Sequence, residues 1–278
     1  MFARIALTTC LILGGVGAAA CGPVRTTFAQ PPAAATTFDR AGTDPKALEI
    51  ADAVLAAAGG AEKWAAVKQI KWSESVTTGT GEPITFDEAW DRWNGRHYNK
   101  LHTASVEVIT MISLYDGSGN ALAQQGHQTT RMVGADTARA VAAARDRFQF
   151  DTGVLLLAFL LEAPGTKVTL VADYAGEPGA PPADELKIVF DPKDPTRSST
   201  YYAIVNRETH QIDRIEIVKA GDPDTKRLGY KVTGWAAAGG LKVPAALQNA
   251  GLASETLTFS NLEISTEPDE SLYVPVVQ

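Results

Sequence analysis

The four histidines are the first residues whose types could do chemistry, but their spacing does not bring them together. His97 and His102 lie five residues apart on a predicted strand, so their side chains point to opposite faces of the sheet. His127 and His210 are isolated in loop-like sequence, and no metal-binding motif such as His-Glu-x-x-His occurs. The sequence therefore predicts neither a metal site nor a cofactor.

Carboxylates and one serine are the other candidates for catalysis. Asp87 and Asp91 share one face of a predicted strand, and Glu88 and Arg92 share the other. General acid–base catalysis needs two carboxylates in different environments, whereas alternating charges are typical of a solvent-exposed face. Ser118 lies in Gly-Ser-Gly without the Gly-x-Ser-x-Gly elbow of hydrolases, which indicates a turn. We predict no catalytic residue and no enzyme; an exported hydrolase or isomerase using Asp87, Asp91 or a histidine is a third hypothesis.

The N-terminus carries the pattern of a bacterial export signal. Arg4 is followed by an apolar run from Ile5 to Ala20, too short and too glycine-rich for a spanning helix of about 20 residues. Cys21 follows Ala18-Ala19-Ala20, an arrangement that resembles a lipobox, and Gly22 in place of Asp favours the outer membrane. We predict a signal peptide over residues 1–20, lipidation of Cys21 and periplasmic anchoring to the outer membrane. Cleavage after Ala29, giving a secreted or soluble periplasmic protein, is the alternative.

Composition limits the classes of partner. The 278 residues carry a formal net charge of −7, with 45% hydrophobic and 21% charged residues. An acidic chain without lysine and arginine clusters argues against binding to nucleic acid or to anionic lipid by charge. The only two cysteines are Cys10 and Cys21, both in the signal region, so the remaining chain has no disulfide and no thiol chemistry.

The periodicity predicts one mainly β domain over residues 44–278, preceded by a flexible tether over residues 21–43 that is rich in proline, alanine and threonine. Asp44-Pro45 begins a helix that Gly59-Gly60 ends, and a shorter helical turn follows. About eleven strands follow, interrupted by helical segments at 136–147 and 154–161. A sheet this long must curl or close. We expect a strongly curved antiparallel sheet, or open β-barrel, wrapped around helices; a two-sheet sandwich leaves the helix at 154–161 without a place.

One set of apolar and aromatic residues could carry function. These residues come from separate elements that we expect to face one interior, where they would form either a packed core or the lining of a cavity for an acyl chain. The set comprises Trp72, Phe86, Trp90, Met111, Leu156, Phe159, Tyr202 and Tyr230.

The element order and several short strings resemble the LolA/LolB-like superfamily of lipoprotein-sorting proteins, in a poorly characterised branch, over about residues 44–276. The strings are Gly59-Gly60-Ala61-Glu62-Lys63-Trp64, Trp90-Asp91-Arg92-Trp93-Asn94-Gly95-Arg96, Tyr201-Tyr202-Ala203-Ile204-Val205-Asn206-Arg207-Glu208-Thr209-His210, Gly229-Tyr230, Gly234, Leu241-Lys242-Val243-Pro244 and Leu272-Tyr273-Val274-Pro275. The resemblance implies a hydrophobic cavity between sheet and helices that holds acyl chains. It does not imply that this protein carries lipoproteins.

The leading hypothesis is an exported, lipid-anchored envelope protein that binds an acyl chain, another hydrophobic ligand or a lipoprotein in the barrel cavity, without catalysis. The membrane is reached through Cys21, an envelope protein is a possible partner, and nucleic acid is not. The alternative is a structural or interaction lipoprotein with a filled core and no ligand.

Overall fold

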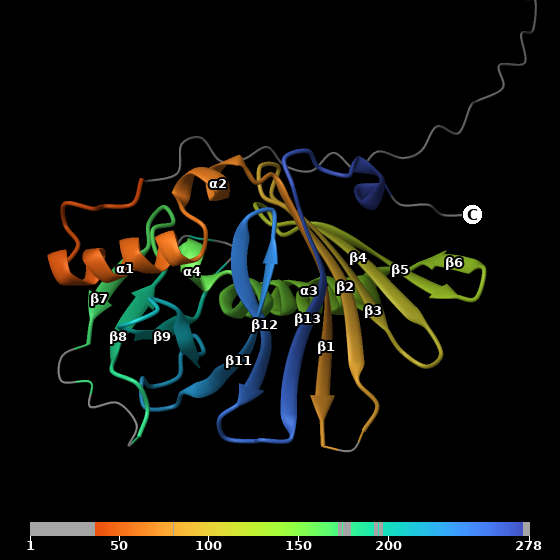
Figure 1. Cartoon of the computed structure of the whole chain (residues 1–278). Coiled ribbons are helices and arrows are strands. Elements are labelled where there is room, and N and C mark those ends of the chain that lie inside the picture. Colours follow the sequence, from red (N-terminus) through yellow and green to blue (C-terminus); the bar gives the residue numbers. More distant parts are fainter. Residues whose placement is uncertain are drawn as a thin grey trace, which may run out of the picture.

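The computed structural model describes residues 37–274, apart from residues 80, 172–173, 175–178, 192–193 and 195–196. Its dominant feature is one antiparallel sheet of 13 strands that curves around a long helix (Figure 1). The predicted signal peptide, Cys21 and most of the predicted tether lie outside the described residues, so the predictions made for them stay predictions.

The sheet confirms the predicted class, a mainly β chain with an open, strongly curved antiparallel sheet. The strands are β1 Gln69–Thr78, β2 Ile84–Asp91, β3 Arg96–His102, β4 Glu107–Ser113, β5 Gly119–Gln125, β6 Gln128–Arg131, β7 Lys167–Leu170, β8 Ala183–Val189, β9 Thr200–Asn206, β10 Ile212–Val218, β11 Leu228–Ala238, β12 Leu241–Asn249 and β13 Glu255–Ser265. The sequence missed β5 and β6, whose polar, amide-rich residues have low β-propensity.

The strand order consists of two meanders joined at one point. Strands β1 to β6 follow one another on one side, and β7 to β13 follow one another on the other. Pairing of β1 with β13 joins the two meanders, which leaves β6 and β7 at opposite edges of the sheet. The chain must therefore cross the concave face between β6 and β7, and the segment that crosses it is helical.

Helices cover the concave face. They are α1 Pro45–Ala57, α2 Ala61–Ala66, α3 Gly134–Leu155 and α4 Leu157–Leu160; a separate 3-10 helix, η1 Glu270–Tyr273, lies beside β3 and contacts Arg96. In Figure 1, α3 runs across the concave face, and α1 and α4 lie at the end of the sheet near β7. The two helical segments predicted at 136–147 and 154–161 form one continuous α3 and, after a break at Leu156, the short α4. None of the described helices combines the length and apolar character needed to cross a membrane.

The first helix shows how local chemistry fixes an element. The Asp44 side chain accepts a hydrogen bond from the Ala47 backbone N–H at 2.9 Å, and Pro45 occupies the first helical position. The buried face of α1 carries Ala47, Ile50 and Val54, which pack into the core. Just before it, Arg40 pairs with Asp52 of α1 at 2.8 Å and with Glu162, which fastens the described part of the predicted tether to the domain.

Curvature comes from irregular pairing. The registers shift between β1 and β13, between β9 and β10, and twice along the pairing of β11 with β12. In β13 the irregularity coincides with Asn261, whose φ of 51° is left-handed. Such bulges bend a strand and increase its twist, so the sheet curls around α3.

Candidate functional site

Six of the eight residues predicted to line one interior lie on the concave face. Trp72, Trp90, Leu156, Phe159 and Tyr230 belong to the buried core cluster. Phe86 is half-buried beneath α3, with the Arg147 guanidinium 4.9 Å from its ring centroid. Whether these residues bind a ligand stays a prediction.

The other two residues, Met111 and Tyr202, correct the expectation of one shared interior. Met111 lies opposite Tyr98 in the β3–β4 register, next to the inward-facing pair of His97 and Ile112. Adjacent pairs point to opposite faces of a sheet, so Met111 points away from α3. Tyr202 lies on the convex face, where the Arg227 guanidinium stacks 3.6 Å from its ring centroid. Met111 and Tyr202 are only 1% and 2% exposed, so burial alone did not reveal their face.

Aromatic packing fills the interior at the C-terminal end of α3. Trp64 stacks on Phe159 with ring centroids 4.6 Å apart, and Trp90 meets Phe148 edge-to-face at 5.3 Å. Arg92 closes this group, because its guanidinium lies 3.6 Å from the Trp64 ring centroid and donates to the Trp64 and Val67 carbonyls at 2.7 Å each. This part of the predicted lining contacts other side chains.

An open groove lies beside this packed region, between α3 and strands β9 to β11. We call it the α3 groove; its volume is 540 Å³. It is lined by Ala143, Asp146, Arg147, Gln149, Phe150, Ser198, Ser199, Tyr201, Ile217, Lys219, Ala220 and Leu228.

The lining of the α3 groove combines apolar side chains with polar and charged ones in similar measure. Phe150, Ile217 and Leu228 contribute apolar surface, and Phe150 meets the predicted residue Tyr230 edge-to-face at 5.4 Å. Gln149 links α3 to β9, because its backbone carbonyl accepts a hydrogen bond from the Tyr201 hydroxyl at 3.0 Å. No sequence pattern indicates this groove, because its residues come from elements far apart in the chain.

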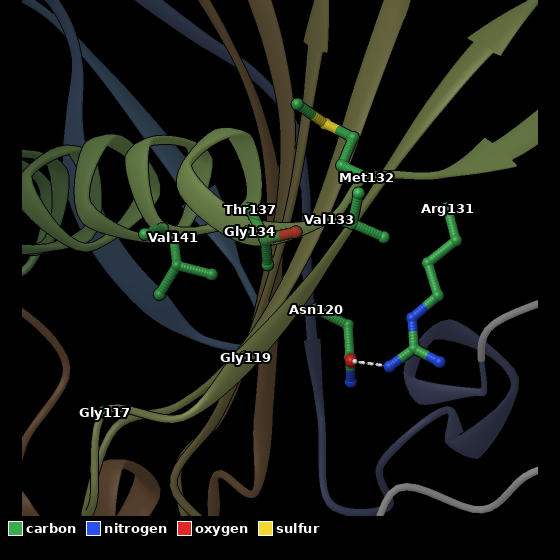
Figure 2. A pocket seen from close by; sticks show the side chains of 10 residues that line it. Gly117, Gly119, Asn120, Arg131, Met132, Val133, Gly134, Thr137 and Val141 are labelled. Carbon is green, nitrogen blue, oxygen red and sulfur yellow. Dashed lines mark hydrogen bonds between the residues drawn. The ribbon is translucent and has the colours of Figure 1, made fainter.

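A second hollow of 530 Å³ lies at the other end of α3, near the edge strands β5 and β6 (Figure 2). Figure 2 shows Met132, Val133 and Val141 beside Gly119, with Arg131 donating to the Asn120 side chain at 3.2 Å on one side. Val133 is 71% exposed. None of the predicted site residues lines this hollow, and Arg131 is the only charged residue in its lining.

A buried cluster of carboxylates lies between α3 and the first strands, and the sequence analysis missed it. Glu74 of β1, Glu88 of β2 and Asp151 of α3 each offer an oxygen within 4.8 Å of the others. Arg147 lies 2.5 Å from Asp151 and also contacts Glu74, while His97 Nε2 lies 2.9 Å from Glu88 Oε2. The side chains of all three acids are fully buried.

Burial controls the protonation of this cluster. Desolvation, reinforced by Asp151, raises the pKa of Glu74 to about 9, and desolvation raises the pKa of Glu88 to about 7. Desolvation and the charge of Glu88 also raise the pKa of Asp151. Burial lowers the pKa of His97 to about 3, so its ring is neutral where Nε2 meets Glu88.

The predicted solvent face of alternating charge is wrong for two of its members. Glu88 and Asp91 are 3% and 0% exposed. Asp91 accepts from the Arg96 guanidinium and from the Asn94 side chain, and so closes the β2–β3 hairpin that Asn94-Gly95 predicts. The strand periodicity was correct, but the two acids are buried for different reasons: Glu88 lies on the concave face that α3 covers, whereas Asp91 lies on the same face as Asp87 and is covered by its ion pair with Arg96.

The histidine predictions hold where they can be tested. His97 and His102 lie on opposite faces, because His97 contacts Glu88 under α3 whereas His102 Nε2 lies 2.7 Å from Asp87 on the convex face. Ser73 donates to the other oxygen of Asp87 at 2.6 Å. Asp87 therefore lies between Ser73 and His102. In a catalytic triad the histidine contacts the serine directly, so His102 does not activate Ser73 in that way.

Ser118 forms the turn that its glycine neighbours predict. Its backbone N–H and its hydroxyl both contact Asp116 Oδ1, at 2.9 Å and 2.8 Å. His127 and His210 are exposed in turns.

No protein-family model and no curated protein matches the sequence. Similar solved structures include a DUF1329 family protein from Desulfovibrio piger, 11% identical with a TM-score of 0.48, covering 83% of this chain and 98% of that one. A putative outer membrane lipoprotein-sorting protein domain from Vibrio parahaemolyticus is 13% identical, with a TM-score of 0.40 and coverage of 82% and 96%. A LolA superfamily protein from Nitrosomonas europaea is 11% identical, with a TM-score of 0.37 and coverage of 81% and 97%.

Each of these solved structures covers more than four-fifths of this chain. Their names describe those proteins, and the proposals below rest on the geometry of this chain.

Proposed function

We propose that this chain is an exported envelope protein that holds the acyl chain of an amphipathic molecule in the α3 groove, without chemical turnover. The observation that carries the proposal is that three apolar side chains, Phe150, Ile217 and Leu228, line this groove on the concave side of the sheet. Lys219 at the same groove offers a cation to an acidic head group.

The size of the groove suits one acyl chain. Its 540 Å³ falls within the range of about 300–1,000 Å³ that small-molecule sites occupy. Each buried CH₂ contributes about 0.8 kcal/mol, so a chain of about 14 methylenes yields roughly 11 kcal/mol. Association costs about 4–15 kcal/mol, so the net gain is at most about 7 kcal/mol, which corresponds to reversible binding in the micromolar range.

Localisation and anchoring follow from the N-terminal sequence. Lipidation of Cys21 would place the domain in the periplasm on the outer membrane, and cleavage after Ala29 would release it. A reversible hydrophobic site suits either arrangement, because the ligand and not the anchor enters the groove.

The test is native mass spectrometry with lipid extraction on the exported protein. We expect phospholipid or fatty acid to co-purify with the wild-type protein and to be strongly reduced in Leu228→Glu, which replaces an apolar residue of the groove lining by a charge. Val189→Glu is the matched control, because Val189 is a strand residue that is 36% exposed and does not line the groove. Equal lipid in a folded Leu228→Glu protein would exclude the groove as the site.

A second function is favoured by the aromatic packing around Trp64, Trp90 and Phe159. In this case the protein is an interaction lipoprotein with a filled core that binds an envelope partner through its surface. A wild-type mass without ligand, unchanged after incubation with fatty acids and phospholipids, would support this function over the first.

A further inference from the structure

The buried carboxylates form a constellation that ligand binding in the α3 groove does not use. We propose that Glu74, Glu88 and Asp151 bind a hard divalent cation, such as Ca²⁺, Mg²⁺ or Mn²⁺, between α3 and strands β1 and β2. One oxygen of each residue lies within 4.8 Å of the others, which is the spacing that a cation with oxygen ligands at about 2.0–2.6 Å can bridge.

Unsatisfied polar atoms give an independent reason to place a ligand there. Glu74 Oε2 and Glu88 Oε1 are buried and have no hydrogen-bond partner. Trp72 lies directly opposite Glu88 in the β1–β2 register, and the buried Trp72 Nε1 also lacks a partner. Native proteins leave few buried polar atoms unpaired. A cation takes up the carboxylate oxygens, and one of its water ligands reaches the remaining polar atom.

The local charge specifies the valence. Three carboxylates meet one guanidinium, Arg147, so two negative charges remain when all three acids are ionised. A divalent cation neutralises the group, whereas an uncompensated buried charge costs several kcal/mol. Arg147 contacts Glu74 Oε1 and both oxygens of Asp151, so the ion would take Glu74 Oε2 and Glu88 Oε1 and share one Asp151 oxygen with Arg147.

The donor set specifies the class of cation. All three ligands are carboxylates, which suit Mg²⁺, Ca²⁺ and Mn²⁺ better than softer ions. His97 holds the other oxygen of Glu88 at 2.9 Å and thereby orients this carboxylate, as outer partners of metal ligands commonly do. An ion here would fasten α3 to the sheet and so rigidify one wall of the α3 groove.

The test measures metal content and thermal stability of the exported protein. After removal of metal with EDTA, the protein is titrated with CaCl₂, MgCl₂ or MnCl₂, and bound metal is counted by mass spectrometry after equilibrium dialysis. We expect one equivalent of bound ion. At a hundredfold excess over the dissociation constant, Tm should rise by about 5–10 °C.

Glu88→Gln removes one ligand charge with little change in shape and should weaken binding at least tenfold. Glu49→Gln is the control, because Glu49 is an exposed acid on α1. Absence of bound ion and of any shift in the wild-type protein would overturn the proposal and show that protons neutralise the cluster. Equal binding by a folded Glu88→Gln protein would overturn it as well; if that variant does not fold, Glu74→Gln is used in its place.

Discussion

Gly153 of α3 allows the helix to pack against β9, and its replacement by alanine tests this packing. A Cβ atom at Gly153 would lie 2.2 Å from the Tyr201 hydroxyl oxygen, 2.4 Å from Cζ and 2.5 Å from Cε1. Carbon atoms in favourable contact lie about 3.5–4.0 Å apart, so the ring must move by about 1 Å or more. Tyr201 is 2% exposed and meets Phe190 edge-to-face at 5.7 Å, which leaves it little room.

The magnitude follows from opposing effects. Overpacking costs about 1–3 kcal/mol, and loss of the hydrogen bond from Tyr201 to the Gln149 carbonyl costs about 0.5–1.5 kcal/mol. Alanine in place of glycine within a helix returns about 1 kcal/mol. We expect the free energy of unfolding to fall by about 2 kcal/mol and Tm to fall by about 4–8 °C.

Thermal unfolding followed by circular dichroism measures this change, and a double-mutant cycle with Tyr201→Phe assigns its cause. Removing the hydroxyl removes the shortest of the three contacts, so Gly153→Ala should cost less in the Tyr201→Phe background, by at least about 0.5 kcal/mol. Unchanged or increased stability of Gly153→Ala would refute the reasoning, because helix propensity would then outweigh the contact with Tyr201.

Three further predictions concern the aromatic group and the buried acids. Phe159→Ala should lower the free energy of unfolding by about 3–5 kcal/mol in urea titrations, because Phe159 is 3% exposed and stacked on Trp64; a loss below about 1 kcal/mol would contradict the packing described. Arg92→Lys should cost about 1–2 kcal/mol in the same assay, because lysine cannot both stack on Trp64 and donate to two carbonyls as the guanidinium does; equal stability would contradict this role. In EDTA, stability should fall as pH rises from about 6.5 to 9, because the raised pKa of Glu74 makes the native state bind more protons than the unfolded state in this window. Glu74→Gln should flatten this slope, and a rising slope in the wild-type protein would show the sign to be wrong. His97 acts in the opposite direction only below about pH 6.5, since its pKa is lowered in the native state.

The sequence predicted those elements whose ends are set by residues close together in the chain. Asp44 and Pro45 predicted the start of α1, and Asn94-Gly95 predicted the turn between β2 and β3. The helical spacing of apolar residues and the alternation along β1 and β2 were sufficient to predict the fold class. Strands β5 and β6 escaped because they gain their stability from pairing with β4, and not from their own propensity.

The faces of apolar strands could not be predicted. Residues 107–114 and 200–206 contain nearly continuous apolar runs, so the alternation of apolar and polar residues does not show which face of the sheet Met111 or Tyr202 occupies. Only the cross-strand register decides which of two adjacent residues points to the helix. The same limit applies to Glu88, because an alternating charged strand looks solvent-exposed until α3 is placed over it.

The sequence by itself determined the mainly β class and the position of the first helix, because both depend on short-range patterns of apolar spacing and capping; the export signal stays a prediction from the same kind of pattern. The tertiary structure decided where the functional groups meet. The carboxylates of residues 74, 88 and 151 come together because curvature of the sheet and the crossing of α3 bring distant segments within a few ångströms. The α3 groove depends on the same crossing, since a helix laid across a curved sheet fills one part of its concave face and leaves another part open.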